Sequence, residues 1–246
     1  MILARAVWRA LRVVLHGLQG LAVCAFVFPF LDARSRMQRV GRWSAKMLVV
    51  LGIRWDGSGA PHAGPVLYVA NHVSWLDILV INALQPARFV SKADVRHWPV
   101  LGYLVACGGT LFIERERKRD ALRVVHQIAQ ALKDGEIVAV FPEGTTSEGH
   151  GLLPFHANLL QAAIAVDAPV QPIALRYSDA RHPVSPAVAY VGDTSLMQSI
   201  RWIVMADGLH AQIHFLDTQR TTRLDRRALA QTLSEAIAQR LSDMRP

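Results

Sequence analysis

From Pro65 to the end of the chain, short apolar runs rich in β-branched residues alternate with longer stretches of helical periodicity. The runs predict strands at 66–70, 88–91, 110–113, 137–141, 170–175, 187–191 and 211–215. Helical spacing of apolar residues predicts helices at 118–133, 155–166 and 222–244. This alternation indicates an α/β fold, a single domain with a central mixed, partly parallel sheet flanked by helices.

The N-terminal part differs, because residues 13–31 carry no formal charge and 19 residues of helix roughly match one bilayer crossing. His16, Gly17, Gln19, Gly20 and Pro29 interrupt this stretch. A second amphipathic stretch follows, with Met37, Val40, Trp43 and Met47 at helical spacing among basic residues. We therefore expect residues 1–56 to form a two-helix membrane anchor lying in one leaflet. A single span and a cleavable signal peptide are the alternatives.

The stretch 57–64 (GSGAPHAG) is expected to be the linker between this anchor and an α/β domain over 57–246. Charge supports a membrane partner, since residues 1–60 hold nine Lys and Arg against two Asp and Glu. No nucleic-acid motif accompanies this basicity, so we expect membrane lipid and no nucleic acid as the partner. Cys24 and Cys107 form neither a disulfide framework nor a zinc pattern, which favours a reducing, cytosol-facing compartment.

Polar residues interrupt the apolar stretch VANHVSWLDILV at 69–80. Burying polar side chains costs several kcal/mol unless they are paired. Ser74 and Asp77 form a Ser-x-x-Asp helix start, which leaves His72 in the loop between strand 66–70 and the helix. We expect His72 to fold back onto Asp77, which would fix its tautomer and stabilise the imidazolium form. The alternative is a capping carboxylate beside a strand-end histidine.

Two further stretches combine strand ends with groups that suit an anion. GTLFIER (109–115) ends an apolar strand with Arg115, and FPEGTTS (141–147) follows a buried strand with a turn. Backbone N–H groups in such turns can bind an anion, and arginine recognises phosphate bidentately. Glu143 is expected to orient Arg115 or to accept a hydrogen bond from a substrate hydroxyl. A surface ion pair and an ordinary turn are the structural alternatives.

Together these stretches resemble the motifs of the glycerolipid acyltransferase family, the lysophosphatidic acid acyltransferases and their relatives. The family's Asn-His-x4-Asp is present as Asn71, His72 and Asp77. Its Gly-x-x-Phe-Ile-x-Arg appears as Gly109, Phe112, Ile113 and Arg115, and its Phe-Pro-Glu-Gly-Thr-x-Ser as 141–147. A weaker block matches 170–175. The resemblance covers roughly residues 65–180.

This resemblance implies that His72 acts as general base and Asp77 as its partner. It implies that Arg115, with Glu143, Gly144 and Thr145, holds the phosphate end of the acceptor. Lys92 resembles a lysine that family members often carry between the first two motifs. The chain has no Gly-x-Ser-x-Gly elbow, so we expect direct transfer without an acyl-enzyme.

The implied reaction moves a fatty acyl group from acyl-CoA or acyl carrier protein to lysophosphatidic acid, giving phosphatidic acid. It implies no metal and no further cofactor, and it places the active site on the cytoplasmic side of the inner membrane. Another lysolipid acceptor, such as a lyso-ornithine lipid or lysophosphatidylglycerol, is the nearest alternative. A non-catalytic lipid carrier and a membrane-attached hydrolase remain alternatives from other classes.

Overall fold

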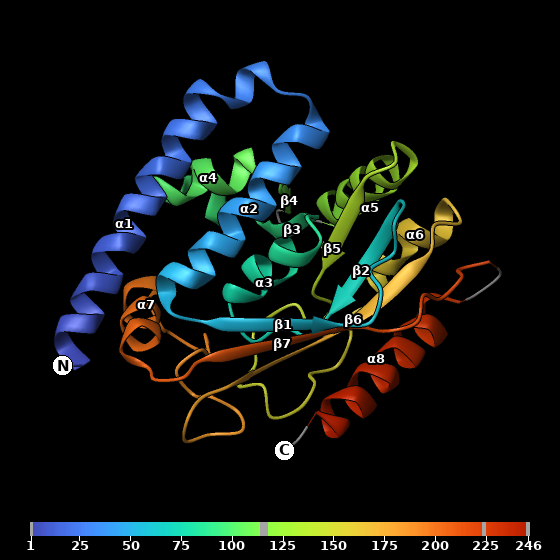
Figure 1. Ribbon diagram of the computed structural model, residues 1–246. Helices are drawn as coiled ribbons and strands as arrows, with labels where there is room; N and C mark the ends of the chain where they lie inside the picture. Colours follow the sequence, from blue (N-terminus) through green and yellow to red (C-terminus); the bar gives the residue numbers. More distant parts are fainter. Residues whose placement is uncertain (1, 114–117, 223–224, 245–246) are drawn as a thin grey trace.

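The computed structural model describes residues 2–113, 118–222 and 225–244, and these residues build one α/β domain around a mixed seven-stranded sheet (Figure 1). The strand order is β1-β7-β6-β2-β5-β3-β4, and only the β6–β7 pair is antiparallel. The strands are β1 (Arg54–Ser58), β2 (Val66–Ala70), β3 (Arg88–Lys92), β4 (Leu111–Ile113), β5 (Ile137–Val140), β6 (Val170–Ser178) and β7 (His210–Phe215). The expected α/β class with a partly parallel sheet is confirmed.

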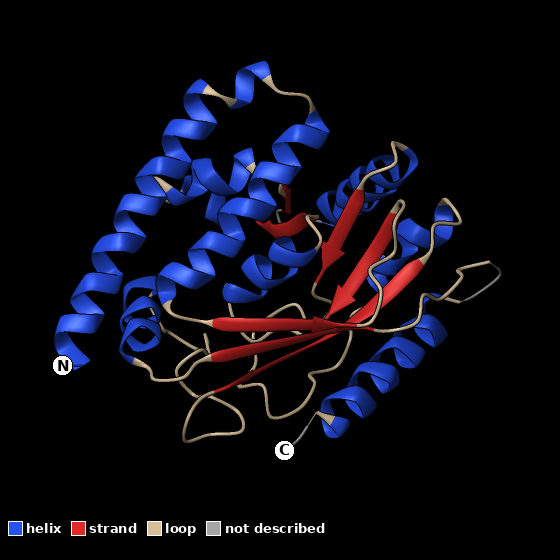
Figure 2. Ribbon diagram, in the orientation of Figure 1, coloured by secondary structure: helices blue, strands red, loops and turns tan. Residues whose placement is uncertain are grey.

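Helices cover both faces of this sheet (Figure 2). They are α1 (Ile2–Phe26), α2 (Ala33–Leu51), α3 (Leu76–Leu84), α4 (Leu101–Cys107), α5 (Lys118–Lys133), α6 (Gln161–Ala165), α7 (Leu196–Met205) and α8 (Arg226–Asp243), with 3-10 turns η1 (Phe28–Phe30), η2 (Ala93–His97) and η3 (Ala157–Leu160). One core lies between the sheet and α2, α3 and α7 and is built on Leu48, Tyr68 and Ile203. The other lies under α5, α6 and α8 and includes Ile128 and Leu233.

Three sequence expectations need correction. Strand β1 was not expected, and it pairs in parallel with β7, so Gly57 and Ser58 belong to the sheet and the loop begins after them. Residues 187–191 do not form a strand and lie outside the seven-stranded sheet. The amide of Tyr190 instead donates to the carbonyl of Val73 at 3.1 Å, which holds this segment over the loop after β2. The third correction is that helices α4 and α7 were not anticipated.

The last two predicted helices differ from expectation at their boundaries. The helix expected at 155–166 is divided into η3 and α6. The tail helix, expected from 222, begins at Arg226, because the carboxylate of Asp225 accepts hydrogen bonds from the amides of Arg227 and Ala228. Helix α5 has the predicted bounds 118–133.

Two of the interruptions of α1, His16 and Gly20, face α2, and the helix continues through all four that lie within it. The His16 ring stacks on Trp43 with centroids 5.0 Å apart, and each residue also hydrogen-bonds the other's backbone carbonyl. At Gly20 a Cβ would lie 2.7 Å from Trp43 Nε1, so only glycine allows this approach. His16 and Gly20 therefore mark the contact of α1 with α2.

The two N-terminal helices differ in whether they could enter a membrane. By length and composition alone, α1 is the one helix among the described residues that could cross a bilayer, over Leu3–Phe26. Helix α2 forms as expected but buries Met47, Leu48 and Leu51 in the protein core. The expectation of a two-helix anchor is thus reduced to one candidate anchor, α1, held on a helix that belongs to the folded domain.

Candidate active site

Asn71 fixes the point at which the chain leaves β2. Its side-chain amide donates to the carbonyl of Leu175 at 2.9 Å and accepts from the Leu175 amide at 2.8 Å. The buried side chain thereby continues the hydrogen bonding of β6 past the end of β2, and both of its own polar groups are satisfied. This pairing explains a polar residue directly after a fully apolar strand, and it sets the position of the loop that follows.

His72 and Asp77 meet as the sequence predicted, with His72 Nδ1 2.8 Å from Asp77 Oδ2. Helix α3 begins at Leu76, two residues later than expected, and Asp77 lies in its first turn. The same Oδ2 accepts hydrogen bonds from the amides of Val73 and Ser74, at 2.8 and 3.0 Å. Asp77 rather than the Ser74 hydroxyl therefore satisfies the helix start, where the helix dipole also favours a negative charge.

Tyr177 holds the other oxygen of Asp77. Its hydroxyl donates to Asp77 Oδ1 at 2.7 Å, from strand β6. Both residues are buried, and burial together with the Asp77 charge raises the pKa of Tyr177 well above its ordinary value. The phenol therefore stays protonated and acts as a donor. Sequence reasoning missed Tyr177, although a tyrosine at the end of a buried strand requires a hydrogen-bond partner.

The His72 ring is held flat against Phe141, with centroids 3.9 Å apart and planes 8° from parallel. The backbone carbonyl of His72 accepts hydrogen bonds from the Ser147 amide at 2.8 Å and from the Ser147 hydroxyl at 3.2 Å. Because Nδ1 bonds Asp77, Nε2 is the nitrogen left to exchange a proton with a substrate. The side chain is 19% exposed, so the ring is ordered by its neighbours yet reachable from solvent.

Glu143 joins the loops after β2 and β5. One carboxylate oxygen accepts from the His72 amide at 2.8 Å, and the other accepts from the Leu153 amide at 3.0 Å. Burial raises the pKa of Glu143, although these two amides act in the opposite direction. Both oxygens bind backbone amides, a contact that the sequence did not reveal, and this arrangement makes Glu143 a support for His72.

The remaining predicted site residues follow strand ends at the same edge of the sheet. Gly144 (φ +72°) and the exposed Thr145 form the turn after β5, and the exposed Lys92 ends β3. Strands β2, β5, β3 and β4 are neighbours and parallel, so their carboxyl ends share one edge. In the strand order, the strand that Lys92 ends lies two strands from β2, which leads into the His72 loop. Arg115 lies outside the described residues.

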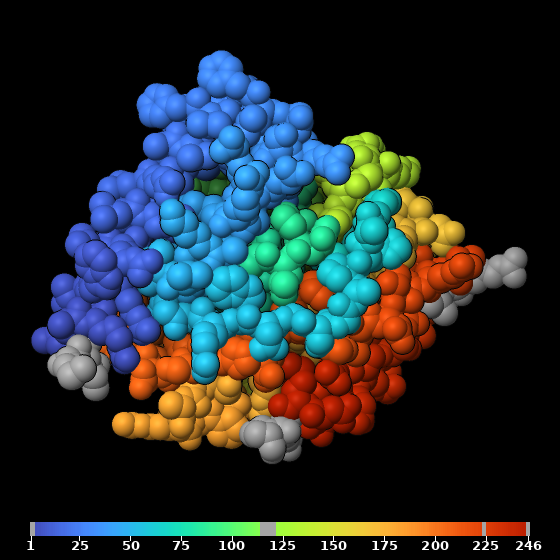
Figure 3. Space-filling view, in the orientation of Figure 1, coloured from blue at the N-terminus to red at the C-terminus, as the bar shows by residue number. Residues whose placement is uncertain are grey.

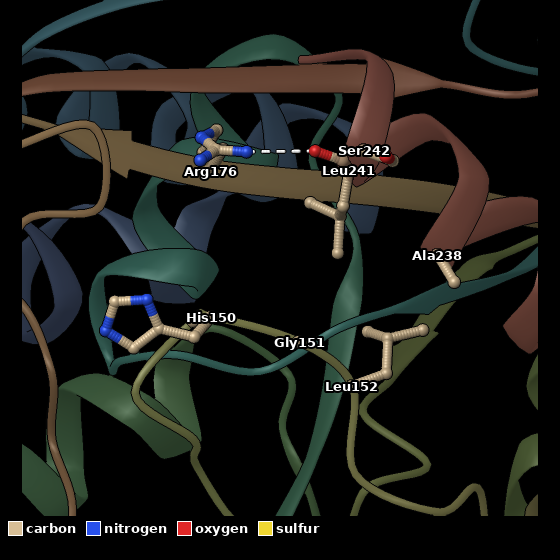
Figure 4. Close-up of a pocket in the computed structure, with 8 residues that line it drawn as sticks. His150, Gly151, Leu152, Arg176, Ala238, Leu241 and Ser242 are labelled. Atoms are coloured by element: carbon tan, nitrogen blue, oxygen red, sulfur yellow. Dashed lines mark hydrogen bonds between the residues drawn. The ribbon is translucent and has the colours of Figure 1, made fainter. Parts of the chain in front are cut away.

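A small cavity lies beside Arg176 of β6, as Figure 4 shows. Its volume is about 170 Å³, and it is lined by the loop 149–152, by Arg176 and by α8. Arg176 is buried, and it donates to the carbonyl of Leu241 at 2.9 Å and to that of Pro183 at 3.2 Å. Adjacent strand residues point to opposite faces, so this cavity is separate from the His72–Asp77 pair.

With this geometry in place, the family comparison becomes informative. A family model described as Acyltransferase matches residues 53–176, the span that contains the His72–Asp77 pair, Glu143 and β6. The chain belongs to the Acyltransferase family. The resemblance drawn from the motifs is thereby confirmed, and the described site residues of those motifs converge at one sheet edge.

Curated relatives in this family carry two different names. A lyso-ornithine lipid O-acyltransferase of Pseudomonas aeruginosa is 36% identical over 89% of this chain and 86% of its own length. A 1-acyl-sn-glycerol-3-phosphate acyltransferase of Neisseria meningitidis serogroup B is 38% identical over 85% of this chain and 83% of its own. The crystal structure of the 1-acyl-sn-glycerophosphate acyltransferase PlsC from Thermotoga maritima shares the fold. It superposes with a TM-score of 0.67 at 18% identity and covers 96% of this chain and 97% of its own.

Proposed function

We propose that this protein transfers a fatty acyl group from a thioester to the free hydroxyl of a lysolipid, with His72 as general base. The observation that carries the proposal is the 2.8 Å contact between His72 Nδ1 and the buried Asp77 carboxylate. Such a contact leaves Nε2 able to accept a proton and stabilises the imidazolium that results. Tyr177 and the amides of Val73 and Ser74 hold the carboxylate in place.

In the proposed reaction the acceptor's hydroxyl oxygen attacks the thioester carbonyl carbon while His72 Nε2 takes the hydroxyl proton. A new C–O bond forms and the carbonyl oxygen gains the negative charge of a tetrahedral intermediate. When the C–S bond breaks, the imidazolium returns the proton to the leaving thiolate. The products are an ester and a free thiol, and His72 is again neutral. Asp77 keeps its charge throughout.

For the acceptor we propose lysophosphatidic acid, with phosphatidic acid as the product. Lys92 ends β3, two strands from the His72 loop, and the stretch that contains Arg115 directly follows β4. The Lys92 cation, two strands along the sheet edge, suits a phosphate separated from the reacting hydroxyl by a glycerol backbone. In the same proposal the Gly144–Thr145 turn closes the phosphate site, and Glu143 supports it through the backbone.

A lyso-ornithine lipid is the second candidate acceptor, and one feature of the loop after β5 favours it. Residues 143–156 contain Glu143, Glu148, His150 and His156 but no lysine or arginine. A loop without permanent cations suits a head group that carries an amino group better than it suits a phosphate. Two of the acyltransferases that resemble this chain, from Pseudomonas aeruginosa and Rhizobium meliloti, carry this acceptor in their names.

We further propose that α1 lies along the cytoplasmic leaflet of the inner membrane. Near its start Arg9 donates to the carbonyls of Val204 and Ala206, and near its middle His16 and Trp43 bind each other. A helix tied to the folded domain at both places lies on one side of the bilayer instead of crossing it. The donor, acyl-CoA or acyl carrier protein, would then approach from the cytoplasm, where Lys92 and Arg96 offer positive charge.

The test is an acyl-transfer assay with the purified full chain in mixed micelles. Labelled acyl-CoA or acyl carrier protein is supplied with lysophosphatidic acid, lyso-ornithine lipid or lysophosphatidylglycerol, and the lipid products are separated. We expect His72→Ala to lower turnover by roughly 10²- to 10⁴-fold. The exposed His126→Ala, on α5, serves as the control and should leave turnover unchanged.

Each alternative predicts a distinct result in the same assay. Free fatty acid without an acylated lipid would show a hydrolase. Lipid binding that survives His72→Ala, with no turnover in either protein, would show a carrier. Preference for the lyso-ornithine lipid would overturn the lysophosphatidic acid proposal and the phosphate role of Lys92.

A further inference from the structure

Helix α7 has one exposed face that is mostly apolar. Met197 is 74% exposed, Trp202 43% and Met205 39%, and the exposed polar residues Gln198 and Arg201 lie among them. At 100° per residue, the exposed residues Met197 to Trp202 span an arc of about 140° on the helix. The opposite face is buried through Ser199, Ile203 and Val204. Large apolar side chains gathered on one arc of a short helix mark a contact surface.

This surface of α7 adjoins the exposed face of α1. Arg9 of α1 donates to the carbonyls on either side of Met205, at 3.2 Å each, and Arg5 pairs with Asp207 at 2.7 Å. The two segments lie side by side in Figure 1, and Figure 3 shows them on the same face of the molecule. The exposed face of α1 here consists of Leu3, Val7, Trp8 and Leu11.

The buried face of α7 contacts the loop that carries the reactive pair. Trp75 Nε1 donates to the Ser199 hydroxyl at 3.0 Å. Trp75 directly follows Ser74, whose amide binds Asp77. Helix α7 therefore connects an exposed apolar surface to the backbone next to His72 and Asp77. It does so although it lies more than one hundred residues further along the chain.

We propose that α7 is a second membrane-binding element, which inserts Met197, Trp202 and Met205 into an anionic leaflet beside α1. Charge supports lipid as the occupant, since Arg201 is the one charged residue of α7 and residues 1–31 contain no Asp or Glu. Asp207, at the junction, is paired with Arg5. Tryptophan and arginine side chains are suited to the interface, where a ring lies at head-group depth and a guanidinium reaches the phosphates.

The membrane contact of α7 does not depend on the proposed lysolipid acyltransferase function. Only its consequence for the entry of the acceptor rests on that function. Two contacts, α1 and α7, fix the rotation of the domain on the leaflet, whereas α1 alone would leave the domain free to roll about the helix axis. Because α7 holds Trp75, the fixed orientation presents the His72 loop to lipids in the same leaflet. The acceptor would then enter from the bilayer without passing through water.

The test measures the depth of single labelled cysteines in the full chain and does not use acyl transfer. Cys24 and Cys107 are first replaced by alanine. Met197→Cys, Met205→Cys, Trp8→Cys and Leu122→Cys are then labelled with an environment-sensitive fluorophore. The proteins are reconstituted into vesicles of equal parts phosphatidylglycerol and phosphatidylcholine, with or without a nitroxide-bearing lipid. Leu122 of α5 is 62% exposed and is the matched control away from α7.

We expect the nitroxide lipid to quench both α7 labels about two-fold or more relative to the Leu122→Cys label, as it does the Trp8→Cys label. Quenching of the Trp8 label with α7 labels no different from Leu122 would overturn the proposal and leave the α1 anchor in place. Absence of quenching at both helices would overturn the membrane placement of α1 and α7. A failed acyl-transfer assay with quenched α7 labels would instead contradict the proposed reaction alone.

Discussion

The hydroxyl of Tyr177 donates to Oδ1 of Asp77 across 2.7 Å, from a strand one hundred residues further along the chain. With His72 Nδ1 on Oδ2, both oxygens of this buried carboxylate have a side-chain donor. Phenol, carboxylate and imidazole thus form one hydrogen-bonded series that ends at the exposed edge of the His72 ring. The first prediction follows from the effect of the phenol on the carboxylate charge.

Replacing Tyr177 by phenylalanine removes a donor that spreads the charge of Asp77. Asp77 then keeps His72 Nδ1 and two backbone amides as partners but loses the phenol that fixes its second oxygen. We expect kcat to fall roughly ten-fold, the equivalent of about 1.4 kcal/mol for one lost hydrogen bond. The measurement is the rate of acyl transfer at saturating lysolipid.

Tyr68→Phe is the matched control, because it removes a hydroxyl from another tyrosine of the same core that does not contact Asp77. Its kcat should stay close to that of the native protein. An equal fall of kcat in both variants would show that general loosening of the core, and not the Asp77 contact, is the cause.

The variant Glu143→Gln tests whether the pKa of Glu143 is raised in the folded protein. Burial raises the pKa of Glu143 above its ordinary 4.5, so the folded protein binds this proton more tightly than the unfolded chain. The stability that this proton contributes is fully present below pH 4.5 and is lost as the pH rises through the raised value. We therefore expect the free energy of unfolding of the native protein, relative to Glu143→Gln, to decline over that window.

Chemical denaturation of both proteins across the acidic range gives this difference directly. Glu148→Gln, at an exposed position in the same loop, is the control and should show no such slope. A constant difference between native and Glu143→Gln proteins would contradict the raised pKa.

Two glycines of α1 should respond oppositely to alanine. A Cβ at Gly17 meets nothing within 4 Å, so Gly17→Ala should stabilise the helix by about 0.5–1 kcal/mol. A Cβ at Gly20 lies 2.7 Å from Trp43 Nε1, so Gly20→Ala must displace α1 from α2. We expect Tm to rise for the first variant and to fall for the second. Equal rises would show that α1 does not pack on Trp43.

Arg176 should matter for stability through α8. Arg176→Gln removes donors to the carbonyls of Pro183 and Leu241, and we expect the free energy of unfolding to fall by roughly 1–3 kcal/mol. Arg181→Gln changes an exposed arginine nearby and should be neutral. Urea denaturation compares the two, and similar midpoints would show that the buried contacts contribute nothing net.

Much of the site could be foreseen because its groups are close in sequence. His72 and Asp77 are five residues apart, so a helix start between them was enough to predict their contact. The strands that carry the motifs were visible as apolar runs, since a strand buried on both faces needs such a run. The partners of these motif residues could not be read in this way, and Tyr177 and Leu175 are both about one hundred residues from the groups that they bind.

The sequence by itself determined the α/β class, the contact between His72 and Asp77, and the family, because periodicity, local spacing and motif order are properties of short segments. Tertiary structure alone decided that Asp77 has a phenol behind it, that Glu143 binds two backbone amides and that α2 belongs to the core. It also placed α7 against both α1 and Trp75. These relationships depend on which distant segments share a face of the sheet, and that choice is made by packing over the whole domain.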